Sequence, residues 1–85
     1  MKGEALFLKM LGDETRLKII KQLLKGEVCA CKLIPSTKRA QSTVSKHLSD
    51  LEKAEILKSR RDGRCIYYSI KDMRVFKLCK IMCIK

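Results

Sequence analysis

The hydrophobic positions of the N-terminal part of this chain follow the spacing of helices. Residues 4–11, EALFLKML, place apolar side chains on nearly every side of a short helix, which must therefore be buried on more than one face. Residues 13–26, DETRLKIIKQLLKG, predict a second helix with Asp13 as its N-cap and Gly26 at its C-terminal end. Its expected inward stripe consists of Leu17, Ile20 and Leu24, widened by Ile19 and Leu23.

Two further helices are predicted in the middle of the chain. Residues 28–39, VCACKLIPSTKR, indicate a short helix or helical turn that Pro35 interrupts. Residues 40–57, AQSTVSKHLSDLEKAEIL, show the i, i+4, i+7 spacing of one buried helical face. The residues on that face are Val44, Leu48 and Leu51.

The C-terminal third predicts a hairpin followed by a last helix. Residues 56–70, ILKSRRDGRCIYYSI, reverse at Asp62 and Gly63, a dipeptide that fits a two-residue type I′ turn between strands. Residues 71–85 predict a helix with Val75, Cys79, Met82 and Cys83 on one side. Since one small domain can hardly cover the apolar surface of both terminal helices, we expect them to form the interface of a homodimer.

Together these elements describe a winged helix-turn-helix fold, mostly α with a β-hairpin wing. The 85 residues are enough for one modest core, so residues 1–85 form a single domain. The chain has no Ser/His/Asp grouping, no Gly-rich phosphate loop and no carboxylate pair in an apolar setting. We therefore do not expect an enzyme.

The charge of the chain indicates a polyanionic partner. Twenty Lys and Arg residues against nine Asp and Glu residues leave a net charge of +11. A helix fits the major groove of DNA and a hairpin can lie against phosphates or the adjacent minor groove, so we expect double-stranded DNA to be the partner. The expected DNA contacts are Lys38, Arg39, Gln41, Ser42, Thr43, Ser45, Lys46, His47, Arg60, Arg61 and Arg64.

The sequence shows neither an export signal nor a membrane span. Its apolar run ALFL is short and lies between Glu4 and Lys9. Five cysteines are an odd number for a disulfide scaffold, so reduced thiols are expected. We expect a cytoplasmic protein with no membrane partner.

Three segments share a pattern with one known family. LGDETRLKIIKQLLKGEVCACKL, AQSTVSKHLSDLEKAEIL and RRDGRCIYYSI together resemble the ArsR/SmtB family of metal- and metalloid-responsive transcriptional repressors. The resemblance covers roughly residues 5–70 in one register. It implies a dimeric winged helix-turn-helix, paired through its first and last helices, on a partly palindromic operator.

The resemblance also gives two cysteines a role. In arsenic- and antimony-responsive members, and at the related cadmium/lead/zinc site, a Cys-x-Cys begins the helix before the recognition helix, and Cys29 and Cys31 match it. The third cysteine of the arsenic-responsive prototypes falls on Ile34 here, and the acidic residue that often follows the second cysteine is Lys32. The family's zinc site on the last helix needs histidines that KDMR lacks.

Two thiolates do not complete a site, because trivalent arsenic takes three sulfurs and zinc four ligands. Cys79 and Cys83 are one helical turn apart and could supply ligands from the same or the partner chain, or could pack as small hydrophobes. Cys65 is a poorer candidate, and its basic neighbours should lower its pKa and favour oxidation. The expected effector is As(III), or else Cd or Zn, and none is required for folding.

Three functions remain open from the sequence. The first is a repressor released from its operator by a thiophilic ion that Cys29 and Cys31 bind. The second is a regulator that senses thiol oxidation, and the third is a nucleic-acid-binding protein without a ligand, either an architectural protein on DNA or a winged helix that binds RNA. In the first case, residues i and i+2 point to different helix faces, so binding one ion would distort the helix beside the recognition helix.

Overall fold

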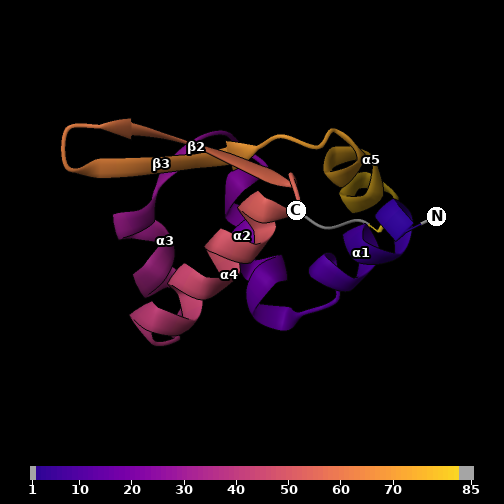
Figure 1. Ribbon diagram of the computed structural model, residues 1–85, viewed down its shortest axis with the longest axis horizontal. Helices are drawn as coiled ribbons and strands as arrows, with labels where there is room; N and C mark the ends of the chain where they lie inside the picture. Colours follow the sequence, from indigo (N-terminus) through magenta and orange to yellow (C-terminus); the bar gives the residue numbers. More distant parts are fainter. Residues whose placement is uncertain (1, 83–85) are drawn as a thin grey trace.

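The computed structural model describes residues 2–82, which form five helices and a three-stranded sheet (Figure 1). This arrangement confirms the winged helix-turn-helix fold. The elements are α1 (Lys2–Leu11), α2 (Glu14–Leu23), β1 (Val28–Cys29), α3 (Ala30–Thr37), α4 (Gln41–Lys53), β2 (Leu57–Asp62), β3 (Cys65–Ile70) and α5 (Arg74–Ile81).

Helix α2 begins where the sequence predicts but ends earlier, because its C-cap is Leu24 and not Gly26. The extended Asp13 is its N-cap and accepts a hydrogen bond of 3.0 Å from the backbone N–H of Arg16. Past its other end, Gly26 has a φ of 136°, a left-handed conformation that favours glycine, and donates its N–H to the carbonyl of Leu23. Both ends thus satisfy backbone groups that the helix itself leaves unpaired.

The core lies where α2, α3 and α4 pack against one another and against the base of the sheet. Its centre includes Leu33 and the predicted face of α4, namely Val44, Leu48 and Leu51. On α2 the buried face is rotated from the predicted stripe. Ile19, Ile20 and Leu23 are fully buried, whereas Leu17 and Leu24 are half-buried.

The predicted helix over residues 28–39 is wrong at its start and at its interruption. Val28 and Cys29 are extended and pair with Tyr68 and Tyr67 of β3, so the sheet has the order β1-β3-β2. Helix α3 then runs through Pro35 to Thr37. A proline there removes only one N–H, the one that would reach the carbonyl four residues earlier, and so short a helix tolerates the loss.

The hairpin turn differs by one residue from the prediction. Asp62 pairs with Cys65, so the two loop residues are Gly63 and Arg64. Gly63 has a φ of 63°, and Arg64 does not share this positive φ. A positive φ at only the first loop residue is the pattern of a type II′ turn and not of type I′.

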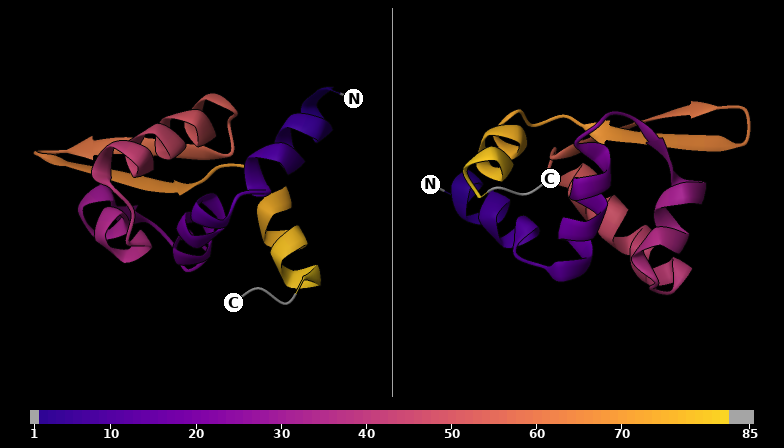
Figure 2. Two further views of the ribbon diagram at one scale, coloured as in Figure 1. Left: turned by 90° about the horizontal axis from the view of Figure 1, so that it is seen from below. Right: turned by 180° about the vertical axis from the view of Figure 1, so that it is seen from behind.

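Helices α1 and α5 lie side by side at the end of the molecule opposite the wing tip (Figures 1 and 2). The Arg74 guanidinium lies 4.2 Å from the centre of the Phe7 ring and joins them. Val75 and Cys79 are buried within this chain, so they do not share an exposed strip with Met82. Apolar side chains that stay exposed at this end are Leu6, Leu8, Met73, Ile81 and Met82. Cys83 lies outside the described residues.

None of the helices in residues 2–82 is both long and apolar enough to span a membrane.

Candidate functional site

The turn between α3 and α4 is built by a buried threonine. Thr37 donates its hydroxyl to the carbonyl of Ile34 at 2.9 Å and accepts from the N–H of Arg39 at 3.3 Å. Lys38 between them is left-handed, with a φ of 59°. These contacts reverse the chain within three residues and set the direction in which α4 starts.

The beginning of α4 presents polar side chains to solvent. Its apolar face is buried, and its first turn contains no acidic residue. The expected contact residues that are exposed here are Lys38, Arg39, Gln41, Ser42, Thr43, Ser45 and Lys46. This surface therefore has the chemistry that a DNA backbone and base edges require.

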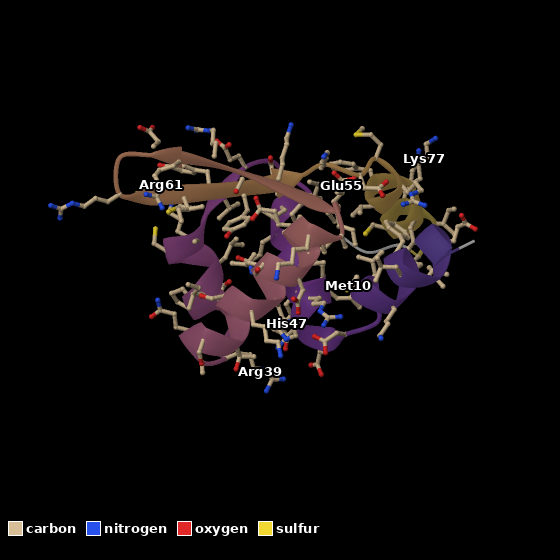
Figure 3. All side chains as sticks on the ribbon, in the orientation of Figure 1. Met10, Arg39, His47, Glu55, Arg61 and Lys77 are labelled. Atoms are coloured by element: carbon tan, nitrogen blue, oxygen red, sulfur yellow. The ribbon has the colours of Figure 1, made fainter. Side chains whose placement is uncertain are left out.

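His47 differs from the other expected DNA contacts, because its side chain is only 17% exposed and faces α2 (Figure 3). Arg16 donates from Nε to its Nδ1 at 3.0 Å, and its Nε2 lies 3.8 Å from a carboxylate oxygen of Asp13. The histidine thus joins α4 to the start of α2. A direct contact of His47 with DNA stays a prediction.

The three arginines of the wing are not equivalent. Arg60 donates from Nε and Nη2 to both carboxylate oxygens of Glu27, at 2.7 and 2.6 Å, and its guanidinium lies over the ring of Tyr67. These hydrogen bonds hold the pKa of Glu27 below its usual value. Arg61, labelled in Figure 3, and Arg64 are exposed and form no ion pair within residues 2–82.

Cys29 and Cys31 meet at the start of α3. Cys29 is the N-cap, and its sulfur accepts from the backbone N–H of Cys31 at 3.4 Å. The two sulfurs lie 2.9 Å apart, with Cys29 buried and Cys31 exposed. The expectation that the two side chains would point to different faces of one helix is wrong, because Cys29 is extended and precedes α3, and the two sulfurs meet without any rearrangement.

The thiols influence one another's ionisation. Hydrogen bonds from the thiol and the N–H of Cys31 lower the pKa of Cys29. The same contact raises the pKa of Cys31, which Lys32 opposes only weakly. The pKa of Cys65 is also raised, chiefly by its interaction with Cys29. The expectation that basic neighbours would lower the pKa of Cys65 is wrong, since the neighbouring thiol dominates.

The pairing of β1 with β3 brings Cys65 close to the start of α3, which the sequence does not indicate because β1 is not evident in it. A cavity of about 250 Å³ is lined by all three of these cysteines. Its other lining residues are Glu27, Val28, Lys32 and Tyr67. Within residues 2–82 no three His, Cys, Asp or Glu side chains already stand at metal-binding spacing. The three thiols are thus near neighbours but not a finished site.

The structure does not bring Cys79 of the same chain to this cavity. Cys79 packs in the core on α5, at the end opposite the wing tip, where burial raises its pKa (Figure 1). It acts there as a small apolar residue. A contribution from Cys79 of a second chain stays a prediction.

The fold and the exposed start of α4 define a winged helix-turn-helix DNA-binding protein. The family model described as "Bacterial regulatory protein, arsR family" matches residues 13–59, more than half of the chain. The chain belongs to the ArsR family of transcriptional regulators.

Individual relatives agree with this assignment. The chain is 44% identical over 75 residues to the uncharacterized HTH-type transcriptional regulator MJ1325 of Methanocaldococcus jannaschii, covering 87% of this chain and 84% of the relative. It is 36% identical over 76 residues to the cadmium resistance regulatory protein CadC of Listeria innocua (88% and 64%). It is 38% identical over 63 residues to the arsenical resistance operon repressor of Staphylococcus aureus (74% and 61%). The chain thus spans less than two thirds of these last two relatives.

Solved structures share the fold over nearly the whole chain. The transcriptional repressor PagR of Bacillus anthracis superposes with a TM-score of 0.83 at 35% identity, and the match covers 95% of this chain and 93% of the PagR chain. A homodimeric winged helix-turn-helix DNA-binding domain from Mycobacterium bovis superposes with a TM-score of 0.85 at 27% identity, covering 95% and 75%.

Proposed function

We propose that this chain is a homodimeric repressor that leaves its operator when a thiophilic metal or metalloid, As(III) foremost, binds through Cys29 and Cys31. The observation that carries the proposal is the 2.9 Å contact of the two sulfurs at the first turn of α3. Helix α3 packs directly against α4, the expected recognition helix. An ion bound there acts one helix away from the DNA.

The proposed DNA complex depends on the charge of the chain and on its dimerisation. Two chains carry 11 + 11 = +22, so affinity for DNA should fall steeply with salt concentration. The exposed apolar side chains of α1 and α5 supply a surface for pairing. A homodimeric neighbour of the same fold supports that arrangement.

The proposed effector class is supported by two relatives and by the thiol chemistry. One relative is named for cadmium resistance and another for arsenical resistance. Paired sulfur ligands select soft ions over Mg²⁺ or Ca²⁺. Zinc and cadmium remain candidates beside arsenic, and the choice among them belongs to the experiment below.

Release would begin at the first turn of α3. Pro35 has no N–H, so the carbonyl of Cys31 lacks the partner that an uninterrupted helix would give it. The first turn is therefore held by fewer backbone bonds than a regular helix turn. An ion held between the two sulfurs, which already lie 2.9 Å apart, would shift this turn and bias the dimer against its DNA-bound arrangement.

The test is fluorescence anisotropy on duplex DNA from upstream of the chain's own gene, with arsenite, Cd²⁺, Zn²⁺ or hydrogen peroxide added. We expect arsenite to release the wild type and to leave Cys29→Ser/Cys31→Ser bound. Cys79→Ala is the matched control and should respond as wild type does. A double variant that responds to every effector like wild type contradicts the proposal.

The same sulfur contact also favours a second candidate, a sensor of oxidation. Peroxide would take two electrons from the thiols, forming one S–S bond and releasing two waters. In that case peroxide, and not arsenite, would release DNA, and dithiothreitol would restore binding. A footprint without boundaries would instead favour an architectural protein with no operator.

A further inference from the structure

The register of β1 and β3 brings a third cysteine to the pair at the start of α3. Cys29 lies directly opposite Tyr67. Cys65 is two residues before Tyr67 on the same strand, so its side chain leaves the same face of the sheet. Cys65 is therefore the diagonal neighbour of Cys29 across the strand pair. The Cα atoms of such diagonal neighbours typically lie about 7–8 Å apart.

The cavity beside this face is the second observation. It has a volume of about 250 Å³, and Cys29, Cys31 and Cys65 all line it. Cys65 is half-buried, so its thiol can rotate between staggered positions without disturbing the core. The interaction with Cys29 that raises the pKa of Cys65 agrees with this proximity.

We propose that Cys65 supplies the third thiolate of a site within one protomer, in which Cys29, Cys31 and Cys65 bind one trivalent arsenic or antimony ion. This inference rests on the proposed function and names the missing ligand of the same site. In this site Cys65 takes the place of a cysteine at position 34, where the chain has a half-buried isoleucine packed against the core.

The surroundings favour an ion with three ligands over one with four. The remaining acidic side chain at the cavity, Glu27, is held in its ion pair with Arg60, and no histidine lines the cavity. Among the described residues of one chain, a tetrahedral zinc site at this cavity would lack a free fourth ligand. Metal–sulfur bonds of about 2.3 Å keep sulfur ligands within about 4 Å of one another. Cys29 and Cys31 already meet that limit, and a rotation of Cys65 would complete the set.

Binding is a ligand exchange without a change of oxidation state. Arsenous acid, As(OH)₃, loses its three As–O bonds and gains three As–S bonds. Each hydroxide leaves as water with the proton of one thiol, so three thiols yield three waters. The product adds a covalent link between the start of α3 and the wing, which the β1–β3 pairing and the ion pair of Arg60 with Glu27 already hold close together.

The experiment compares two arsenicals on wild type, Cys65→Ser and the control Cys79→Ser. Arsenite can take three thiolates, whereas phenylarsine oxide has one As–C bond and takes two. Binding is followed by sulfur-to-arsenic charge-transfer absorption and by counting the free thiols that remain of five. Circular dichroism verifies that each variant is folded.

We expect arsenite to protect three thiols in the wild type and in Cys79→Ser. Cys65→Ser should bind arsenite more weakly, by about 10- to 100-fold or more, the range typical for loss of a supporting group at a metal site. Its affinity for phenylarsine oxide should match that of wild type.

Two results would overturn the inference, each in a different way. If Cys65→Ser binds arsenite as wild type does, with three thiols protected, the third sulfur lies elsewhere and the proposed function still stands. If Cys29→Ser/Cys31→Ser also binds arsenite and leaves DNA as wild type does, the proposed function fails as well.

Discussion

Arg16 donates from its Nε to the Nδ1 of His47 across 3.0 Å, and thereby joins the first turn of α2 to the middle of α4. The same guanidinium reaches back to the carbonyls of Lys9 and Met10 at the end of α1. One side chain thus connects three helices, among them the expected recognition helix.

Removing the acceptor at position 47 should destabilise the fold. His47→Ala leaves a part-buried guanidinium without its partner, and we expect the free energy of unfolding to fall by about 1–2 kcal/mol. His47→Asn keeps an acceptor near the position of Nδ1 and should lose less. Urea denaturation measures both values. If neither variant changes stability and both weaken DNA binding, His47 is instead a DNA contact.

The N-cap of α2 makes stability depend on acid pH. The backbone N–H of Arg16 lowers the pKa of Asp13 below its ordinary value of 3.8. Because the folded pKa is depressed, the stabilisation is complete above that ordinary value and is lost as pH falls through the folded pKa. Asp13→Asn should flatten this pH dependence and keep the cap, whereas Asp13→Ala should cost about 1 kcal/mol. Thermal unfolding between neutral and acid pH compares them.

Wing arginines should differ in their effect on DNA binding. Arg61→Ala and Arg64→Ala each remove a charge that no carboxylate neutralises within the described chain, so affinity should fall on all DNA sequences alike. The slope of log affinity against log salt should fall by about one for each phosphate that the variant no longer neutralises. Arg60→Ala is the matched control with a smaller expected effect. A larger effect for Arg60 than for Arg61 would mean that the Glu27 pair opens on DNA.

Two glycine substitutions should have opposite effects on stability. Gly63 has a φ of 63° and open space where a Cβ would lie, so Gly63→Ala adds only backbone strain, about 1–2 kcal/mol. Gly3 lies in the first turn of α1, also with open space around it, and Gly3→Ala should stabilise by up to about 0.5 kcal/mol, the lower end of the range for a helix interior. Chemical denaturation gives both signs. A neutral Gly63→Ala would contradict the described turn.

Alkylation should distinguish the cysteines by burial. Cys31 is exposed, whereas Cys79 is 4% exposed and has a pKa that burial raises. Brief treatment with iodoacetamide, followed by peptide mass spectrometry, should therefore label Cys31 and spare Cys79. Adding denaturant should make Cys79 react. Equal labelling in the native protein would mean that α5 does not pack as described.

The helices could be predicted because their signals are local. Val44, Leu48 and Leu51 repeat at helical spacing, and Asp13 is a residue type that favours N-caps. The same helical spacing predicts the buried face of α2 only in part, because Leu17 and Leu24 are half-buried in the structure. Leu17 and Leu24 are as apolar as Ile19, and only the packing of α3 and α4 decides which of them is buried.

Strand β1 could not be predicted, because two residues have no periodicity and pair only with a strand almost forty positions later. That omission also hid the thiol cavity. Without the pairing of Cys29 and Tyr67, nothing local places Cys65 beside the start of α3. The ion pair of Arg60 with Glu27 also joins residues far apart in the sequence. The sequence alone therefore does not distinguish Arg60 from the other two wing arginines.

The point where β1 joins β3 has a mechanical consequence for the wing. Gly63, at the wing tip, precedes Tyr67 by four residues, which is about 13 Å along an extended strand. Over that length, a change of angle where β1 joins β3 moves the tip in proportion to its distance from the pairing. The hairpin therefore converts a small change of angle beside the cysteines into a larger displacement of the exposed Arg64 at its tip.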